Sequence, residues 1–141
     1  MAVDGMFGGS VELLSTSVDL RARNHNYLAG NLANAETPGY APRVLQFEDQ
    51  LRQAVQRTET SVSPVLTNPR HIPLTGVITS VGAVEGEVVE SPASTMGRDG
   101  NGVELDREMA SLAENQIMFN ASIDLLRKKF DTLKLAIKGG N

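Results

Sequence analysis

The segment from Leu105 to Lys138 reads LDREMASLAENQIMFNASIDLLRKKFDTLKLAIK, and it decides the fold. Ten of its positions lie alternately four and three residues apart, and nine of these ten are apolar. Such a heptad seam is typical of a long helix that packs against another helix. The segment holds neither Gly nor Pro, so we predict one axial helix over residues 104–138, roughly 50 Å long. The seam residues are Leu105, Met109, Leu112, Phe119, Ile123, Leu126, Phe130, Leu133 and Ile137.

Both ends of this predicted helix carry the charges that suit a helix dipole. Asp106 is a candidate N-cap in an acidic first turn, and lysines gather in the last turns. Gly139 and Gly140 are expected to stop the helix, which leaves residues 139–141 as a short tail. The tenth seam position is Gln116, which either sets the register against a polar group of another helix or faces a gap.

A second axial helix is predicted over residues 10–34. Ser10 is its candidate N-cap, and Asn34 is expected to end it because Asn tolerates the left-handed conformation. Residues 1–9 are predicted to form a flexible tail. The apolar stripe of this helix follows the same spacing and is weakened in its middle by polar residues; it consists of Leu14, Val18, Leu28 and Leu32.

Residues 35–57 are predicted to hold a turn and a short helix. In the sequence Thr37-Pro38-Gly39-Tyr40, Pro presets φ at the second turn position and Gly supplies a positive φ at the third, which is the pattern of a type II turn. Further on, Phe47, Leu51 and Val55 lie at i, i+4 and i+8. This spacing predicts an amphipathic helix over residues 44–57.

Residues 58–103 differ in composition from the two ends, being rich in Pro, Gly, Val, Ser and Thr. The alternation of Val77, Thr79 and Val81, and the pair Val88-Val89, predict short edge-type strands in an extended segment. We expect this segment to bury little apolar surface. The predicted fold is therefore mainly α, with two long terminal helices in an antiparallel coiled-coil-like hairpin and an extended central segment containing short β elements.

Composition excludes several function classes for this 141-residue chain. It has no Cys, which excludes disulfide frameworks and thiol catalysis, and its net charge of −4 argues against a nucleic-acid partner. No apolar run is long enough for a transmembrane helix. No nucleophile motif or cluster of metal ligands stands out, so we expect no enzyme, no cofactor and no metal site.

Two helices alone leave much of each apolar seam uncovered, and ordering the chain is costly in entropy. We therefore expect the isolated chain to be marginally stable and to complete its fold by packing against other subunits.

The run Asn31-Leu32-Ala33-Asn34-Ala35-Glu36-Thr37-Pro38-Gly39-Tyr40 resembles the signature of flagellar rod and hook axial proteins. The segment Asp99 to Met109, followed by Ala113-Glu114-Asn115, is similar to the closing region of the proximal rod B-type family of flagellar basal-body rod proteins. A central patch, Asn68 to Ile72, is also similar to that family. The resemblance implies an assembly motif made of Asn31, Ala33, Asn34, Thr37, Pro38, Gly39 and Tyr40.

The resemblance further implies a structural subunit of the proximal rod, the drive shaft of the flagellar basal body in the periplasm. It implies export by the flagellar type III apparatus. The implied partners are copies of the chain itself, the C-type and other proximal rod proteins, the MS-ring–rod junction protein and the export gate. A soluble helical adaptor, or an export chaperone that binds a partner helix, is the alternative.

Overall fold

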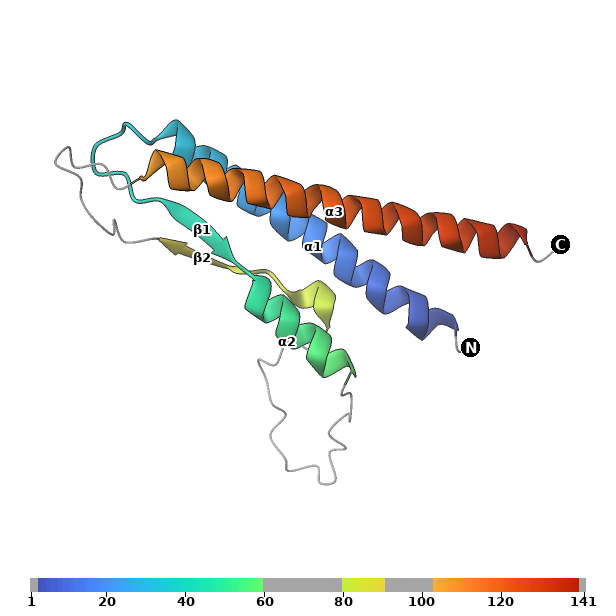
Figure 1. Cartoon of the computed structure of the whole chain (residues 1–141). Coiled ribbons are helices and arrows are strands. Elements are labelled where there is room, and N and C mark those ends of the chain that lie inside the picture. Colours follow the sequence, from blue (N-terminus) through green and yellow to red (C-terminus); the bar gives the residue numbers. More distant parts are fainter. Residues whose placement is uncertain (1–2, 60–79, 91–102, 140–141) are drawn as a thin grey trace, which may run out of the picture.

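The computed structural model describes residues 3–59, 80–90 and 103–139. Helix α1 (Val3–Ala33) and helix α3 (Leu105–Lys138) form a long antiparallel hairpin, with the two chain termini at the same end (Figure 1). A two-stranded sheet and the short helix α2 (Glu48–Glu59) lie beside it. The predicted fold class is confirmed.

Helix α1 begins earlier than the sequence indicates, at Val3 rather than at Ser10, so Ser10 lies inside the helix and is not its N-cap. Residues 3–9 are helical and not a non-helical tail. Gly5, Gly8 and Gly9 favour a later start, because glycine lowers helix propensity, but tertiary context readily overrides propensity.

Helix α1 ends at Ala33, beside the predicted position, but by a different mechanism. Asn34 does not adopt the left-handed conformation: among the described residues only glycines have a positive φ. Its side-chain Nδ2 donates a hydrogen bond to the Gly30 carbonyl oxygen at 2.9 Å, and its backbone N–H donates to the same oxygen at 3.1 Å. Asn34 thus caps one of the carbonyl groups that the end of a helix leaves unpaired.

The helix predicted over residues 44–57 begins too early, because Arg43–Gln46 form strand β1 and α2 begins only at Glu48. Strand β1 pairs antiparallel with strand β2 (Glu87–Glu90), with Val44 opposite Val89 and Leu45 opposite Val88. A strand at Val88-Val89 is as predicted. Residues 43–46 form a strand because they pair with β2 and bond to side chains of α1. These partners are distant in the chain, so the local sequence does not predict the strand.

The hydrophobic core joins the sheet, α2 and one side of α1. Its buried residues are Leu20, Leu45, Phe47, Ala54, Val81 and Val84. Two of them come from the central segment, in contrast to the expectation that this segment buries little. Val81 begins the 3₁₀ turn η1 (Val81–Ala83) and not a strand as expected, and Val84 follows this turn. Val77, Thr79 and the rest of the 58–103 region, apart from residues 58–59, 80–90 and 103, lie outside the described residues.

Gly86 turns the chain from this core segment into β2. Its φ is +71°, and a Cβ there would lie 3.0 Å from Leu45 Cδ1 and 3.1 Å from Phe47 Cβ. Both the backbone conformation and the close approach require a glycine.

Helix α3 spans Leu105–Lys138, in agreement with the seam. Its N-cap is Glu104, whose side chain makes no capping bond, and Asp106 lies in the first turn and is not the N-cap. Gly139 caps the other end by donating its N–H to the Leu135 carbonyl oxygen at 2.8 Å. Neither long helix has, within its described residues, a stretch apolar and long enough to cross a bilayer.

Candidate assembly site

Asn31 is the centre of the motif that the sequence singles out. The residue is fully buried, and its amide group fills its hydrogen-bonding capacity of two donated and two accepted bonds. Nδ2 donates to the Arg43 carbonyl oxygen at 2.8 Å and to Glu108 Oε2 at 3.1 Å. Oδ1 accepts from the Arg43 N–H at 2.9 Å and from Tyr40 Oη at 3.2 Å. One side chain therefore joins α1, the turn, β1 and α3.

The turn that follows α1 has the predicted type II geometry. Gly39 has φ +75°, and the Tyr40 N–H donates to the Thr37 carbonyl oxygen at 3.2 Å. Pro38 and Gly39 are exposed at the tip, and Tyr40 is half-buried so that its hydroxyl reaches Asn31.

The rest of the motif lies around this turn. Thr37 Oγ1 donates to Asn34 Oδ1 at 3.3 Å, which ties the turn to the capped helix end. Ala33 is the exposed last residue of α1. The motif is a rigid connection that returns the chain from α1 to β1.

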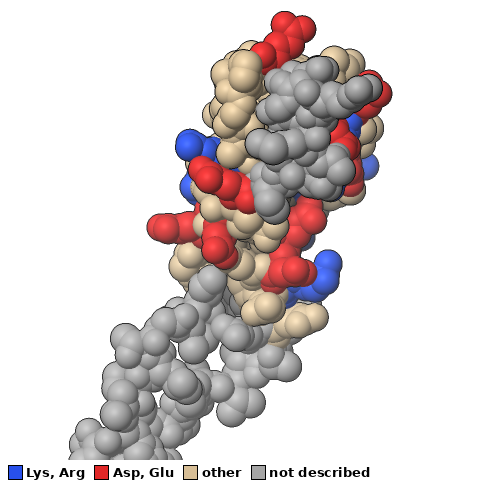
Figure 2. Space-filling model, turned by 90° about the vertical axis from the view of Figure 1, so that its left-hand side faces the viewer, with Lys and Arg blue, Asp and Glu red and all other residues tan. Residues whose placement is uncertain are grey.

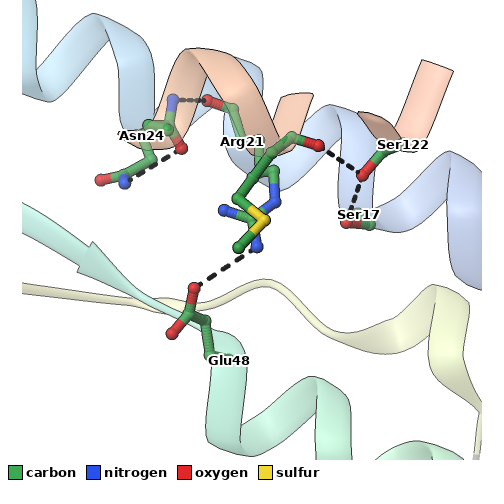
Figure 3. A network of polar contacts seen from close by, with 7 residues as sticks. Ser17, Arg21, Asn24, Glu48 and Ser122 are labelled. Atoms are coloured by element: carbon green, nitrogen blue, oxygen red, sulfur yellow. Dashed lines mark hydrogen bonds and ion pairs between the residues drawn. The ribbon is translucent and has the colours of Figure 1, made fainter. Parts of the chain in front are cut away.

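Polar side chains, spaced seven residues apart on both helices, line the contact between α1 and α3. Asn31 faces Glu108. In the next two pairs, Asn24 Nδ2 lies 3.5 Å from Asn115 Oδ1, and Ser17 Oγ lies 3.4 Å from Ser122 Oγ (Figure 3). A seven-residue step turns an α-helix by only about 20°, so these pairs lie in one line along the hairpin. We call these three pairs the polar ladder.

The ladder is tied to backbone groups as well. Asn115 Nδ2 donates to the Arg21 carbonyl oxygen at 3.0 Å, and Ser122 Oγ donates to the Met118 carbonyl oxygen at 2.9 Å. Asn24 Oδ1 accepts the Leu45 N–H at 3.2 Å, so Asn24 holds β1 as Asn31 does. Among the described residues, no fully enclosed side-chain N or O atom lacks a partner.

The register-setting residue of α3 is therefore Asn115 and not Gln116. Asn115 is buried, whereas Gln116 is exposed and donates from Nε2 to Asn120 Oδ1 on its own helix. Of the two possibilities open for Gln116, a role in setting the register is therefore excluded, because the ladder, and not the centre of the apolar seam, faces α1 most directly.

Arg21 links α1 to the start of α2. Its guanidinium lies 3.4 Å from Glu48 Oε1 (Figure 3). It also lies 5.4 Å from the centre of the Phe47 ring. The carboxylate is largely exposed, so the cation–π contact with a buried ring is the steadier of the two interactions.

The apolar seam of α3 lies beside the ladder and is only partly covered. At its two ends, Leu105 and Met109 are 49% and 54% exposed, and Phe130 and Ile137 are 52% and 79% exposed. The middle seam residues are half-buried; these are Leu112, Phe119, Ile123, Leu126 and Leu133. Monomeric proteins seldom leave a continuous apolar stripe of this length in water.

The sheet does not cover this seam. A cleft between β1 and the hairpin is lined on α3 by Ser111, Glu114 and Asn115. At 100° per residue, Ser111 and Glu114 lie on one side of the ladder, and Met109 and Ile123 lie on the other. The sheet thus approaches α3 from the side opposite to the seam.

The stripe predicted on α1 borders the same uncovered side. Leu14, Val18 and Leu32 are half-buried and are not part of the core around the sheet, whereas Leu28 is buried and lines the cleft toward β1, so it lies outside this face. Toward the chain termini the two helices separate (Figure 1). We call this side of the hairpin, formed by the seam of α3 and these three half-buried residues of α1, the open face.

Sequence reasoning missed the polar ladder, although its signal is present. Ser17, Asn24 and Asn31 recur every seven residues on α1, as do Asn115 and Ser122 on α3. From sequence alone, small polar residues at heptad spacing are interpreted as the exposed face of a helix, because their hydrogen-bonding partners lie on the other helix.

Comparison with known proteins supports the family to which these features point. No family model matches the chain. The chain is 30% identical over 128 residues to the flagellar basal body rod protein FlgB of Escherichia coli, covering 89% of this chain and 90% of that protein. It is 32% identical over 128 residues to FlgB of Salmonella typhimurium, with the same coverage. This chain belongs to the FlgB family of flagellar basal body rod proteins.

The match to FlgB of Bacillus subtilis is 27% identical over 135 residues, 96% of this chain and 98% of that protein, so it includes most of both long helices. Membership of the FlgB family confirms the resemblance carried by residues 31–40 and 99–115. The chain is accordingly a structural rod protein of the flagellar basal body.

Proposed function

We propose that this chain is a subunit of the proximal rod that assembles through the open face. One observation carries the proposal: three polar pairs line the contact between α1 and α3, while the apolar seam of α3 beside them stays half-buried or exposed. In a chain that functions alone the arrangement would be reversed, because burying apolar side chains drives folding.

The motif of residues 31–40 has an indirect role in this proposal. Asn31, Tyr40 and Asn34 fix how the chain leaves α1 and where α3 begins beside it. They therefore set the register that brings the stripes of the two helices onto one face. The motif is an assembly motif because it shapes the open face.

The proposed partners are copies of this chain and other proximal rod proteins, including the C-type. The MS-ring–rod junction protein and the export gate are proposed neighbours at the base of the rod. The chain is proposed to leave the cytoplasm through the flagellar type III apparatus and to work in the periplasm without catalysing a reaction.

Genetic complementation tests this function. A strain that lacks its own proximal rod B-type protein is given this chain, and swarming and the presence of the chain in purified basal bodies are measured. We expect the chain to restore swarming and to purify with the rod. Export of the chain without its incorporation into basal bodies would contradict the proposal.

A further inference from the structure

The two-stranded sheet has one covered edge and one free edge. Strand β1 lies between β2 and α1 (Figure 1), and side chains of α1 cover its outer edge. Asn31 binds both the N–H and the carbonyl oxygen of Arg43, and Asn24 accepts the N–H of Leu45. Among the described residues, β2 pairs with β1 alone. We call the side of β2 (Glu87–Glu90) that faces away from β1 the free edge.

The backbone groups at the free edge follow from the hydrogen bonds of β1. In an antiparallel pair, two residues that lie opposite each other direct their N–H and C=O groups either toward each other or both outward. Arg43 and Leu45 direct theirs outward, to α1, and Glu90 and Val88 lie opposite them. Val88 and Glu90 therefore direct their groups outward at the free edge. Within the described part of the chain, no hydrogen bond to these groups is present.

The side chains of β2 define which strand would fit beside it. The strand reads Glu-Val-Val-Glu, with Val88 42% exposed and both glutamates exposed. Its partner β1 shows the complement, because Arg43 lies 3.3 Å from Glu90 and two apolar residues lie opposite the two valines. A strand presents the same side chains to both of its neighbours. The free edge is therefore complementary to a strand in which basic residues flank two apolar ones.

The surroundings of the free edge favour the same partner. Residues 85–90 contain three glutamates and no basic side chain. Figure 2 looks toward the end of the molecule at which β2 finishes, and Asp and Glu side chains gather on the described surface there. A surface with an excess of one charge attracts partners of the opposite charge. The partner is thus expected to be basic.

The described strands of a second copy do not provide such a partner. Two β2 strands in an antiparallel pair would place Glu87 of each copy opposite Glu90 of the other, and like charges directly opposite each other destabilise a sheet. Strand β1 has suitable side chains, but β2 occupies one of its edges and the asparagines of α1 occupy the other. The free edge therefore fits a strand of a different protein.

We propose that the free edge of β2 binds an extended segment of another protein as an added antiparallel strand, with the side-chain order basic, apolar, apolar, basic. Backbone hydrogen bonds to Val88 and Glu90 supply affinity, and the glutamates select the basic side chains. The sheet approaches α3 from the side opposite to the seam, so this contact is separate from the open face. It does not depend on the proposed rod function.

Peptide binding tests the contact directly. The probe is a fluorescein-labelled peptide with blocked ends, Thr-Arg-Val-Val-Arg-Thr, and its acidic counterpart is Thr-Glu-Val-Val-Glu-Thr. Fluorescence anisotropy with the purified full chain gives the two Kd values at roughly 20 mM salt, where exposed charges are weakly screened. We expect the basic peptide to bind at least about tenfold more tightly, because both flanking pairs change from attraction to repulsion in the acidic one.

N-methylation of the basic peptide tests whether it binds as a strand. In the proposed pairing the second valine of the peptide lies opposite Val88 and donates its N–H to β2, whereas the N–H of the first valine points away. Methylating the second valine should weaken binding about tenfold, since it removes a backbone hydrogen bond. Methylating the first valine is the matched control and should change the Kd little.

Substitutions in the chain locate the peptide on the free edge. Val88→Pro removes the outward N–H, and proline is tolerated where an edge strand faces solvent, so we expect about tenfold weaker binding. Val88→Thr keeps the N–H and should bind as the wild type does. Glu87→Lys should remove most of the preference for the basic peptide. Asp131→Lys makes the same change of charge at an exposed site on α3 and should retain that preference. Circular dichroism verifies the fold of each variant.

Several outcomes would overturn the contact. These are equal binding of the basic and acidic peptides by the wild-type chain, equal binding of the two methylated peptides, and a folded Val88→Pro variant that binds as the wild type does. Self-association of the wild-type chain that Val88→Pro abolishes would place a second copy at the free edge, and it would overturn the assignment to a different protein.

Discussion

The two ends of the α1–α3 hairpin differ in what they bury. At the end near the turn, a fully buried Asn31 binds Arg43, Tyr40 and Glu108, and every hydrogen-bonding group of its side chain is used. At the end near the termini, Phe130 and Ile137 point into solvent, and the helices separate (Figure 1). Polar groups are satisfied within the chain at one end, while apolar groups stay exposed at the other.

This difference shows how one chain can have a single defined geometry at one end and still leave apolar surface exposed at the other. Hydrogen-bonded side chains define a single geometry for the turn end, since any shift leaves a buried polar group without a partner. Apolar packing adapts more readily, so it suits contacts among subunits that meet in several arrangements.

Asn31→Ala should have the largest effect on stability. It removes four hydrogen bonds and leaves the Arg43 backbone groups and the Glu108 carboxylate without this partner in a buried site. We expect a loss of about 3 kcal/mol in urea unfolding, a large part of the stability of a small domain. Asn34→Ala, which removes a helix cap, should cost only about 1 kcal/mol. Equal losses for the two variants would contradict the central role of Asn31.

Gly39→Val should cost about 2 kcal/mol, because a β-branched residue resists a positive φ. The cost comes from the backbone alone, since a Cβ at this position would meet no atom within 4 Å. Gly39→Asn is the control and should retain most of the stability, because Asn tolerates this conformation. Urea unfolding of both variants compares them, and a Val variant as stable as the Asn variant would show that the turn adopts another geometry in solution.

Glu108→Gln should cost about 1 kcal/mol, because a neutral oxygen replaces the carboxylate that accepts from Asn31. Glu108→Leu removes the acceptor altogether and should cost more. The two variants are compared by thermal and urea unfolding. If the Leu variant proves the more stable of the two, the buried Asn31–Glu108 pair does not hold the hairpin together.

Phe130→Gln should change the stability of the isolated chain least, by about 0.5 kcal/mol or less, because this side chain is 52% exposed. The same substitution should prevent incorporation into basal bodies and abolish swarming. Leu135→Gln is the matched control: Leu135 is 72% exposed on the same helix but lies outside the seam, so this variant should still assemble. Loss of swarming in the control alone would place the assembly surface on another face of α3.

The parts of this fold that the sequence predicts are those governed by local patterns. The seam from Leu105 to Ile137 and the glycines after Lys138 place α3 correctly, and Pro38-Gly39 predicts the turn, because helix periodicity and turn conformation depend on neighbouring residues.

The parts that were missed depend on residues far away in the chain. Strand β1 is held by Asn24 and Asn31, and Val81 and Val84 enter the core only because the chain returns to α1. Buried Asn115 resembles a surface residue in sequence, since its partners are on another helix. The sequence predicted the seam residues themselves, but not that the hairpin contact would leave them only partly covered.

The central claim is that the open face is uncovered in the single chain and covered in the rod. Because the chain contains no Cys, Ile137→Cys provides one thiol on this face, at a side chain that is 79% exposed in the single chain. Labelling by a thiol reagent is compared between the purified monomer, intact basal bodies and the same basal bodies in denaturant. We predict rapid labelling of the monomer, strong protection in the intact rod and full recovery in denaturant. Equal labelling of the monomer and the intact rod would contradict the account.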